Sequence, residues 1–206
     1  MLMFVLMATL AYAQKKPLDH SVYDSWKSLN AVSVPRNGDI LIYNINPGEG
    51  DSELVIENIR TGKKTVVPRA TNAKLSEDGS KVVAVIKPFF EQTRQAKIKK
   101  AKKEDMPKDS LALIDVKTGK VEKFANLKSH ATADKWSTYL AFELTPAKEK
   151  AEKKADAKDD KKKPAPKKES NLLVMNVKTA QIDTIKQVSS YKFNEDGSLL
   201  AYVIEP

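Results

Sequence analysis

Apolar residues in this chain are concentrated in short unbroken runs, each of which follows a small polar turn sequence. The run from Val82 to Ile86 follows Asp78-Gly79, and the run from Leu199 to Ile204 follows Asp196-Gly197. An Asp-Gly pair tolerates the positive φ that a tight hairpin turn needs. A continuous apolar run suits a strand that is covered on both faces, and its length and β-branched content favour a strand over a buried helix. The pattern therefore predicts β-hairpins whose second strands, Leu199 to Ile204 included, are buried.

One pattern of 14 residues recurs four times in a single register. Its copies span residues 34–47, 75–88, 133–146 and 193–206, of which the second reads "LSEDGSKVVAVIKP" and the fourth "FNEDGSLLAYVIEP". Gly38, Gly79 and Gly197 occupy the same position, Ser137 replaces the glycine in the third copy, and a proline follows nine residues later in every copy. Repetition in one register is the signature of a repeat architecture.

A second shared segment follows each of the first three copies. It reads "SELVIENIRTGK", "DSLALIDVKTGK" and "SNLLVMNVKTAQ", which places Gly62, Gly119 and Ala180 in register. The Thr-Gly-Lys turns at Thr61 and Thr118 are expected to close a second hairpin with the apolar run before them. Two hairpins form a four-stranded antiparallel unit that repeats at about 41 residues, which is the size of one β-propeller blade.

The repeats predict an all-β fold, a partial β-propeller of about three and a half four-stranded antiparallel blades with two lysine-rich inserts on one rim. The predicted divisions are blade 1 at 34–72, blade 2 at 73–130, blade 3 at 131–190 and the start of blade 4 at 191–206. Residues 14–33 are expected to add an outer strand to a closing blade or to cap the array. A helical repeat would lack Asx-Gly turns, and a β-sandwich would not repeat in constant register.

The residues that this pattern singles out are structural rather than catalytic. They are the turn residues Asn37, Gly38, Gly62, Asp78, Gly79, Gly119, Asp196 and Gly197. Asn37 stands where two other copies carry aspartate, so a negative charge is dispensable there and a hairpin role accounts for these side chains.

The length variation between repeats lies in two inserts, residues 89–109 and 147–169, which also carry the basic charge. Residues 91–108 have seven basic and three acidic residues, and residues 147–168 have ten lysines and five acids. Their summed excess equals the net charge of +9 of the whole chain. Neither segment contains an aromatic residue, which argues against a nucleic-acid site. We expect solvated, flexible or partly helical loops; contact with an anionic surface or an acidic partner is the alternative.

The first residues, "MLMFVLMATLAYAQ", form an apolar run that ends in Ala-Tyr-Ala. A short apolar segment before an A-x-A sequence is typical of a cleavable secretory signal, here residues 1–13, although no Lys or Arg precedes it. The alternative is a buried N-terminal strand or helix. We predict export to the periplasm or medium, a mature chain that starts at Gln14, and no membrane span after signal cleavage.

No catalytic residue, metal ligand or cofactor site is predicted. The chain has no cysteine, and its two histidines, His20 and His130, are far apart and not in metal-ligand spacing. No phosphate-binding glycine loop and no G-x-S-x-G nucleophile elbow occurs. Ordinary surface or packing roles are favoured for both histidines and for Trp26. Trp136 occupies the Asp78 position of its repeat, which favours packing at a blade edge over ligand stacking.

The repeats resemble the Asp-Gly blade motif of periplasmic Tol-type propellers and of the propellers of prolyl oligopeptidase family serine peptidases. The stretches "KKPLDHSVYDSWKSL" and "IKPFFEQTRQAKIKKAKKEDMPKDSLALID" are similar to secreted bacterial members of that peptidase family. The resemblance covers residues 14–206. It implies a propeller that sits on an α/β-hydrolase domain and admits short peptides to a Ser-Asp-His triad.

The chain departs from that family pattern because none of its positions matches a triad residue. It ends at Pro206, directly after an apolar run and where a further second hairpin is expected. The resemblance therefore implies an N-terminal propeller portion that gates peptide substrates to a hydrolase domain of the same polypeptide. A non-catalytic exported propeller, serving as a binding or scaffold module, is the alternative.

Overall fold

The computed structural model describes residues 20–23, 26–35, 38–146 and 171–205. The predicted signal segment 1–13, the turn residue Asn37 and the insert 147–169 lie outside the described residues, so those predictions stay predictions. After a short helix, α1 (His20–Tyr23), the chain forms fourteen described strands and one further helix, α2 (Phe90–Ile98).

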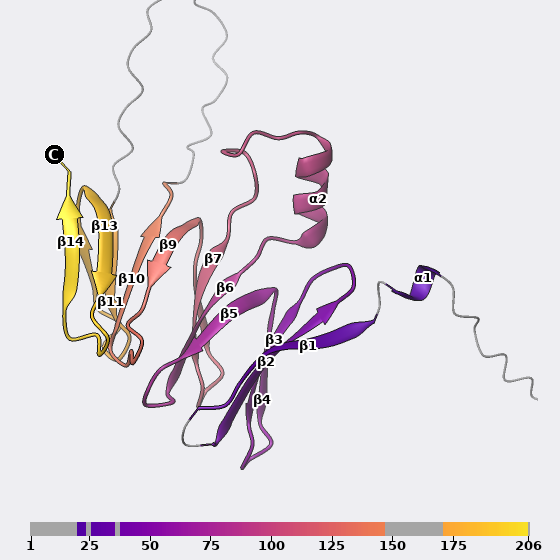
Figure 1. Cartoon of the computed structure of the whole chain (residues 1–206), viewed down its shortest axis with the longest axis horizontal. Coiled ribbons are helices and arrows are strands. Elements are labelled where there is room, and N and C mark those ends of the chain that lie inside the picture. Colours follow the sequence, from indigo (N-terminus) through magenta and orange to yellow (C-terminus); the bar gives the residue numbers. More distant parts are fainter. Residues whose placement is uncertain (1–19, 24–25, 36–37, 147–170, 206) are drawn as a thin grey trace, which may run out of the picture.

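The strands form successive antiparallel sheets in chain order (Figure 1). The first sheet contains β1 (Lys27–Ser33), β2 (Ile40–Pro47), β3 (Glu53–Asn58) and β4 (Lys64–Pro68). The second contains β5 (Ala70–Leu75), β6 (Lys81–Ile86), β7 (Ser110–Asp115) and β8 (Val121–Phe124). The third contains β9 (Leu127–Ala131), β10 (Tyr139–Leu144), β11 (Leu172–Asn176) and β12 (Ile182–Ile185). The fourth pairs β13 (Val188–Phe193) with β14 (Leu200–Ile204).

Each sheet begins with the strand that precedes the repeated turn. The sheets therefore start at Lys27, Ala70, Leu127 and Val188, a few residues before the divisions drawn from the repeats. Residues 27–33, in the predicted N-terminal strand or cap segment, form β1 and pair with β2 of the first sheet. The prediction of an all-β array of antiparallel hairpins is confirmed.

The unbroken apolar runs of the second sheet are buried because a neighbouring sheet covers each face. Alternate residues of a strand point to opposite faces. On β6, Val82 and Ala84 join the core shared with the first sheet, whereas Val83 joins the core shared with the third. On β7, Ile114 and Leu113 are divided in the same way. Packing on both faces thus explains why these strands lack a polar alternation.

The run after Asp196-Gly197 does not have that cover, and the prediction of a buried strand there is wrong. Leu200 packs partly against the third sheet, but Tyr202, Val203 and Ile204 are each roughly half exposed. Among the described strands, β14 pairs with β13 alone, and no sheet lies on its outer face. The same type of sequence is therefore buried in the second sheet and exposed in the fourth.

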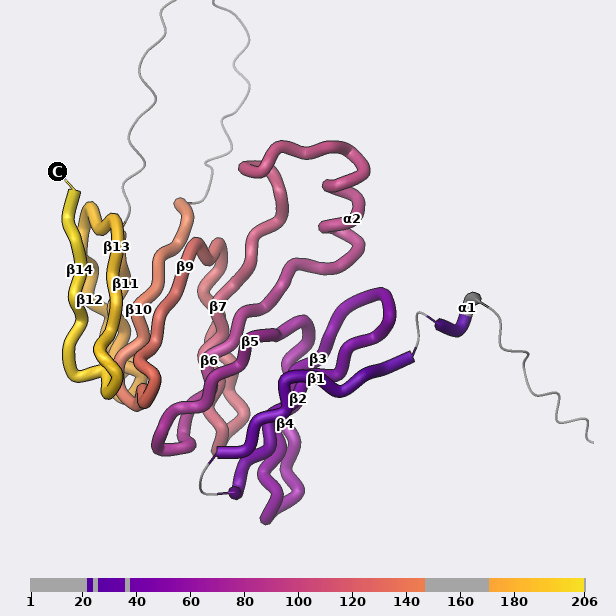
Figure 2. The backbone as a smooth tube through the Cα atoms, viewed as in Figure 1, coloured from indigo at the N-terminus to yellow at the C-terminus, as the bar shows by residue number. Residues whose placement is uncertain are grey.

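Links between sheets lie at one end of the array, which we call the insert rim. Three link residues, Arg69, Asn126 and Gln187, have φ values of 63°, 61° and 59°. Their carbonyl oxygens accept hydrogen bonds from the backbone N–H groups of Lys87, Thr145 and Glu205, at 2.9, 2.7 and 2.9 Å. The connection from β6 to β7, which includes α2, therefore leaves the second sheet at this rim, as the tube in Figure 2 shows. Lys87 and Thr145 lead toward the two inserts.

Candidate functional site

The hairpin turns at the end of the array opposite the insert rim, which we call the turn rim, are built on side-chain caps. In the turn between β7 and β8, the Asp115 carboxylate accepts hydrogen bonds from the Thr118 N–H and hydroxyl at 2.7 and 2.8 Å. Asn58 and Asn176 accept backbone N–H groups in the corresponding turns of the first and third sheets. Such Asx side chains replace a backbone acceptor and hold the turn closed.

These three capping residues are not among the predicted turn residues, although the sequence carries a signal for them. An Asn or Asp stands four residues before Gly62, Gly119 and Ala180 in all three copies. The three residues at the glycine position have φ values of 69°, 79° and 60°, and each donates its N–H to the carbonyl oxygen of the capping residue at 2.8 Å. Ala180 therefore adopts the left-handed conformation without the freedom of glycine.

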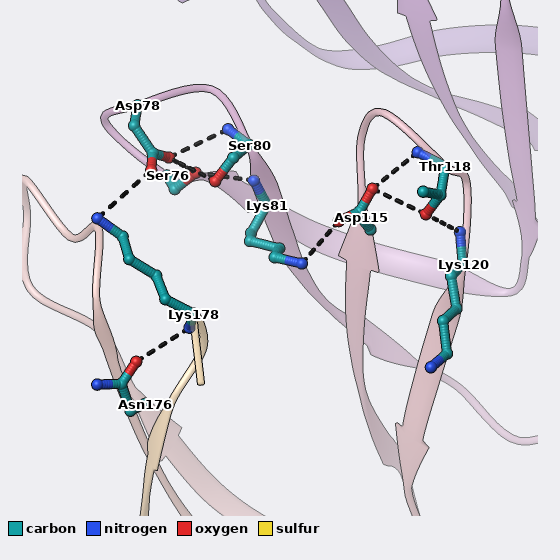
Figure 3. Close-up of polar contacts among 9 residues, drawn as sticks. All are labelled: Ser76, Asp78, Ser80, Lys81, Asp115, Thr118, Lys120, Asn176 and Lys178. Atoms are coloured by element: carbon teal, nitrogen blue, oxygen red, sulfur yellow. Dashed lines mark hydrogen bonds and ion pairs between the residues drawn. The ribbon is translucent and has the colours of Figure 1, made fainter. Parts of the chain in front are cut away.

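The Asp-Gly turns use a second kind of cap, which Figure 3 shows for the Asp78 turn. The Asp78 carboxylate accepts hydrogen bonds from the Ser76 and Ser80 hydroxyl groups, at 2.7 and 2.8 Å, and from the Ser80 N–H at 3.1 Å. Asp196 accepts the N–H and hydroxyl of Ser198 at 2.9 and 2.7 Å. Gly38, Gly79 and Gly197 have φ values of 69°, 71° and 76°. The carboxylates are thus occupied in closing turns.

The electrostatics of these carboxylates follow from their partners. Burial alone would raise the pKa of Asp78, but the hydrogen bonds from Ser76 and Ser80 and the charge of Lys178 bring it below its usual value. The Lys81 ammonium, 2.7 Å from Asp115, together with Thr118 holds the pKa of Asp115 far below its usual range. Both groups are ionised acceptors at neutral pH, and neither is suited to general acid catalysis.

Adjacent sheets are joined to one another through these turns. The N–H of Glu77 donates to the Trp136 carbonyl oxygen at 2.7 Å, and the N–H of Lys135 donates to the Glu195 carbonyl oxygen at 2.9 Å. The Lys63 ammonium donates to the Lys117 carbonyl oxygen at 2.7 Å. The Trp136 side chain is 1% exposed and lies in the core between the second, third and fourth sheets, which agrees with a packing role.

First strands carry polar side chains on the edges of their sheets. The Tyr191 hydroxyl on β13 lies 2.7 Å from the Ser129 hydroxyl on β9, and the buried Glu143 forms an ion pair with Lys128. The β9–β10 pairing shifts register between Glu143 and Leu144, so Lys128 falls outside the regular strand register. This irregularity allows the Lys128 side chain to reach Glu143. Similar irregularities interrupt the first pairing of each other sheet.

This cluster of polar side chains can form hydrogen bonds with a ligand, but it does not place a nucleophile beside a general base. Ser129 and His130 are neighbours on β9, so their side chains point to opposite faces of the strand. Burial lowers the pKa of His130, and burial raises the pKa of Tyr191 while the Ser129 hydrogen bond opposes that rise. Serine, tyrosine and lysine groups at strand edges are suited to hydrogen bonding with polar backbone, such as that of an extended peptide.

Other predicted features have these places in the structure. Trp26 is exposed, at 58%, and its ring lies 4.9 Å from that of Tyr23. In the described part of the chain, no three His, Asp or Glu side chains are grouped as metal ligands. None of the helices in that same part is long and apolar enough to cross a membrane.

Successive antiparallel sheets, three with four described strands and one with two, are linked at one rim and packed face against face, which defines the class of fold as a β-propeller array. The sequence matches no model of a known protein family and no curated protein. A solved structure from a study of two prolyl endopeptidases is similar to this chain, with a TM-score of 0.52 and 13% identity over 86% of this chain and 26% of that one.

Two other solved structures have lower scores. The β-propeller domain of the Trilobed protease from Pyrococcus furiosus has a TM-score of 0.47 and 14% identity, over 83% of this chain and 47% of that one. An acylaminoacyl peptidase from Pyrococcus horikoshii has a TM-score of 0.49 and 14% identity, over 90% of this chain and 29% of that one. The chain spans less than half the length of any of these three proteins.

Proposed function

We propose that this chain is the substrate-gating propeller part of an exported serine peptidase of the prolyl oligopeptidase family. The observation that carries the proposal is the fold similarity to the prolyl endopeptidase structure, which extends over 86% of the chain. The sequence resemblance of residues 14–206 to that family supports it. The triad belongs to a hydrolase domain of the same polypeptide, and these 206 residues contribute no catalytic group.

In the proposed gating, access of a substrate depends on its size and on its polar contacts with the propeller. Sheets buried on both faces form a rigid wall, because their cores are closely packed and resist deformation. The first strands present Lys128, Ser129 and Tyr191 at the sheet edges, where an extended peptide can exchange hydrogen bonds with them. A folded protein is too wide and too rigid to make the same contacts along the strand edges. Short peptides are therefore the proposed substrates, and no nucleic acid is expected to bind.

An antibody raised against residues 14–206 provides the test of the peptidase assignment. Proteins precipitated from the source cells are treated with a fluorophosphonate probe, which labels active serine hydrolases. A labelled polypeptide longer than 206 residues is expected, and pre-treatment with a peptidyl chloromethyl ketone should block the label. A polypeptide of the size of this chain that takes no label and forms a defined closed oligomer would contradict the proposal and favour a binding or scaffold propeller.

Export is tested separately from peptidase activity. The mature N-terminus is determined by mass spectrometry of the periplasmic and medium fractions, where we expect Gln14. The variant Ala13→Asp removes the small residue that a signal peptidase needs and should leave the precursor uncleaved. Cytoplasmic protein with residues 1–13 intact would overturn the export proposal and leave the peptidase proposal standing.

A further inference from the structure

The helix α2 is held on the insert rim by its N-terminal half. The Phe90 N–H donates to the Asp51 carboxylate at 2.7 Å, and the Arg94 guanidinium lies 3.6 Å from the Glu49 carboxylate. The Arg69 guanidinium lies 3.7 Å from the centre of the Phe89 ring. These contacts join α2 to the link and to the β2–β3 connection of the first sheet. The helix is therefore fixed at one end and presents the other end to solvent.

The free end carries a dense group of positive charges, residues 97–103, which we call the lysine segment. It reads "KIKKAKK" and contains Lys97, Lys99, Lys100, Lys102 and Lys103, all exposed. No ion pair joins any of these five lysines to a carboxylate of the described residues, whereas Arg94 and Lys87 nearby each have one. Glu104 and Asp105 follow the segment, and residues 91–108 keep a net charge of +4.

The backbone arranges these lysines in a defined turn. The Lys100 N–H donates to the Lys97 carbonyl oxygen, and the Ala101 N–H donates to the Ala96 carbonyl oxygen, each at 2.9 Å. Lys100 has a φ of 52°, at a position where helices usually end in glycine. The helix therefore ends within the segment, in a turn that is closed by backbone hydrogen bonds. The dipole of a helix places the equivalent of only about half a negative charge at its C-terminus, which does not account for five lysines in seven residues.

Five positive charges within seven residues repel one another, and binding of a polyanion reduces that repulsion. A nucleic-acid site would be expected to place aromatic residues among the lysines, and residues 91–108 contain none. A membrane-surface helix needs a continuous apolar face, and the described side chains of α2 include no buried residue and a single large aliphatic one, Ile98. An acidic polypeptide needs neither feature.

We propose that the lysine segment binds acidic polypeptide segments, through ion pairs between its ammonium groups and successive Asp or Glu carboxylates. The site stands whether or not the chain belongs to a peptidase. Its position at the free end of α2 leaves the segment open to a partner on the insert rim.

The test uses the full chain and fluorescein-labelled decaglutamate, with decaglutamine as the neutral probe. The site variant is Lys99→Gln, Lys100→Gln, Lys102→Gln and Lys103→Gln together. The matched control carries Lys153→Gln, Lys154→Gln, Lys162→Gln and Lys163→Gln, which remove the same charge from the other insert. We expect the site variant to weaken decaglutamate binding by about tenfold or more and the control by about twofold or less. Binding should also weaken as salt is raised.

Several outcomes would overturn the proposal. Equal weakening in the two variants would show an effect of net charge alone, and equal binding of decaglutamate and decaglutamine would remove the role of carboxylates. Tighter binding of phosphatidylserine vesicles or of single-stranded DNA than of decaglutamate would assign the segment to a different partner. Unchanged far-ultraviolet circular dichroism in both variants confirms that the comparison is between folded proteins.

Discussion

The backbone N–H of Glu77 donates a hydrogen bond to the carbonyl oxygen of Trp136, across 2.7 Å, and joins the first hairpin turns of the second and third sheets. The indole of the same tryptophan fills the core beneath that contact. One residue therefore connects two sheets by its backbone and by its side chain. Neighbouring sheets are expected to unfold together because of such shared contacts.

Replacing the Trp136 indole should remove a large part of the free energy of unfolding of this chain. We expect Trp136→Ala to lower the free energy of unfolding by about 3 to 5 kcal/mol, because a large buried side chain leaves a cavity. The control Trp26→Ala removes an exposed ring and should change it by about 0.5 kcal/mol or less. Urea denaturation followed by far-ultraviolet circular dichroism measures both. Similar losses in the two variants would contradict a central role for Trp136.

Ala180 offers a stabilising substitution. Its φ of 60° is strained for a residue with a Cβ, and the equivalent positions hold Gly62 and Gly119. Ala180→Gly should raise the free energy of unfolding by about 0.5 to 1 kcal/mol. The reverse change, Gly119→Ala, should lower it, because its Cβ would lie 3.1 Å from the Thr65 hydroxyl oxygen and its φ is 79°. Thermal unfolding compares the two, and shifts of the same sign would contradict the account.

The Asp115 cap should make stability depend on acid pH. Its pKa in the folded protein is held well below the unfolded value, so its contribution is present above about pH 4 and is lost as pH falls toward the folded pKa. We expect Asp115→Asn to cost roughly 1 to 2 kcal/mol at neutral pH and less below about pH 4. Asp183→Asn, at an exposed strand position, is the control. A difference from wild type that stays constant with pH would exclude the charge as the cause.

His130 should make the free energy of unfolding depend on pH near neutrality as well. Burial lowers its pKa, so the unfolded chain binds a proton more readily than the folded one. The contribution of His130 to stability is therefore fully present above about pH 6.5, and it is lost as pH decreases through that value toward the folded pKa. His130→Gln should remove this slope, whereas His20→Gln should keep it. Unfolding in urea at a series of pH values measures the slope, and an unaltered slope in His130→Gln would refute the assignment.

The exposed apolar residues of β14 should promote self-association of the 206-residue chain. Among the described strands β14 pairs with β13 alone, and a free strand edge with exposed Tyr202, Val203 and Ile204 is a site for pairing with another chain. We expect Val203→Lys to reduce self-association, measured by sedimentation velocity at rising concentration. Gln181→Lys adds the same charge at an exposed position between β11 and β12 of the third sheet. An equal reduction in both variants would point to net charge rather than to the strand.

Much of the candidate site could be read from the sequence, because turn chemistry is local. The Asx-Gly pairs at Asp78 and Asp196 specify backbone angles within a few residues, and the structure places both carboxylates as turn caps. Asn58, Asp115 and Asn176 have an equally regular spacing, four residues before the glycine position of the second turn. The Ser129–Tyr191 contact could not be predicted, because it joins residues 62 positions apart through the packing of two sheets.

The sequence by itself determined the hairpins, their register and the charge of the inserts, because periodic apolar runs and turn residues act over short distances. Only the tertiary structure decided which runs are buried. The runs in β6 and β14 are alike in composition, yet one lies between two sheets and the other is covered on a single face. The sequence left open whether the N-terminal segment adds a strand or caps the array, and the tertiary structure decided for a strand, because β2 satisfies the backbone hydrogen bonds of β1.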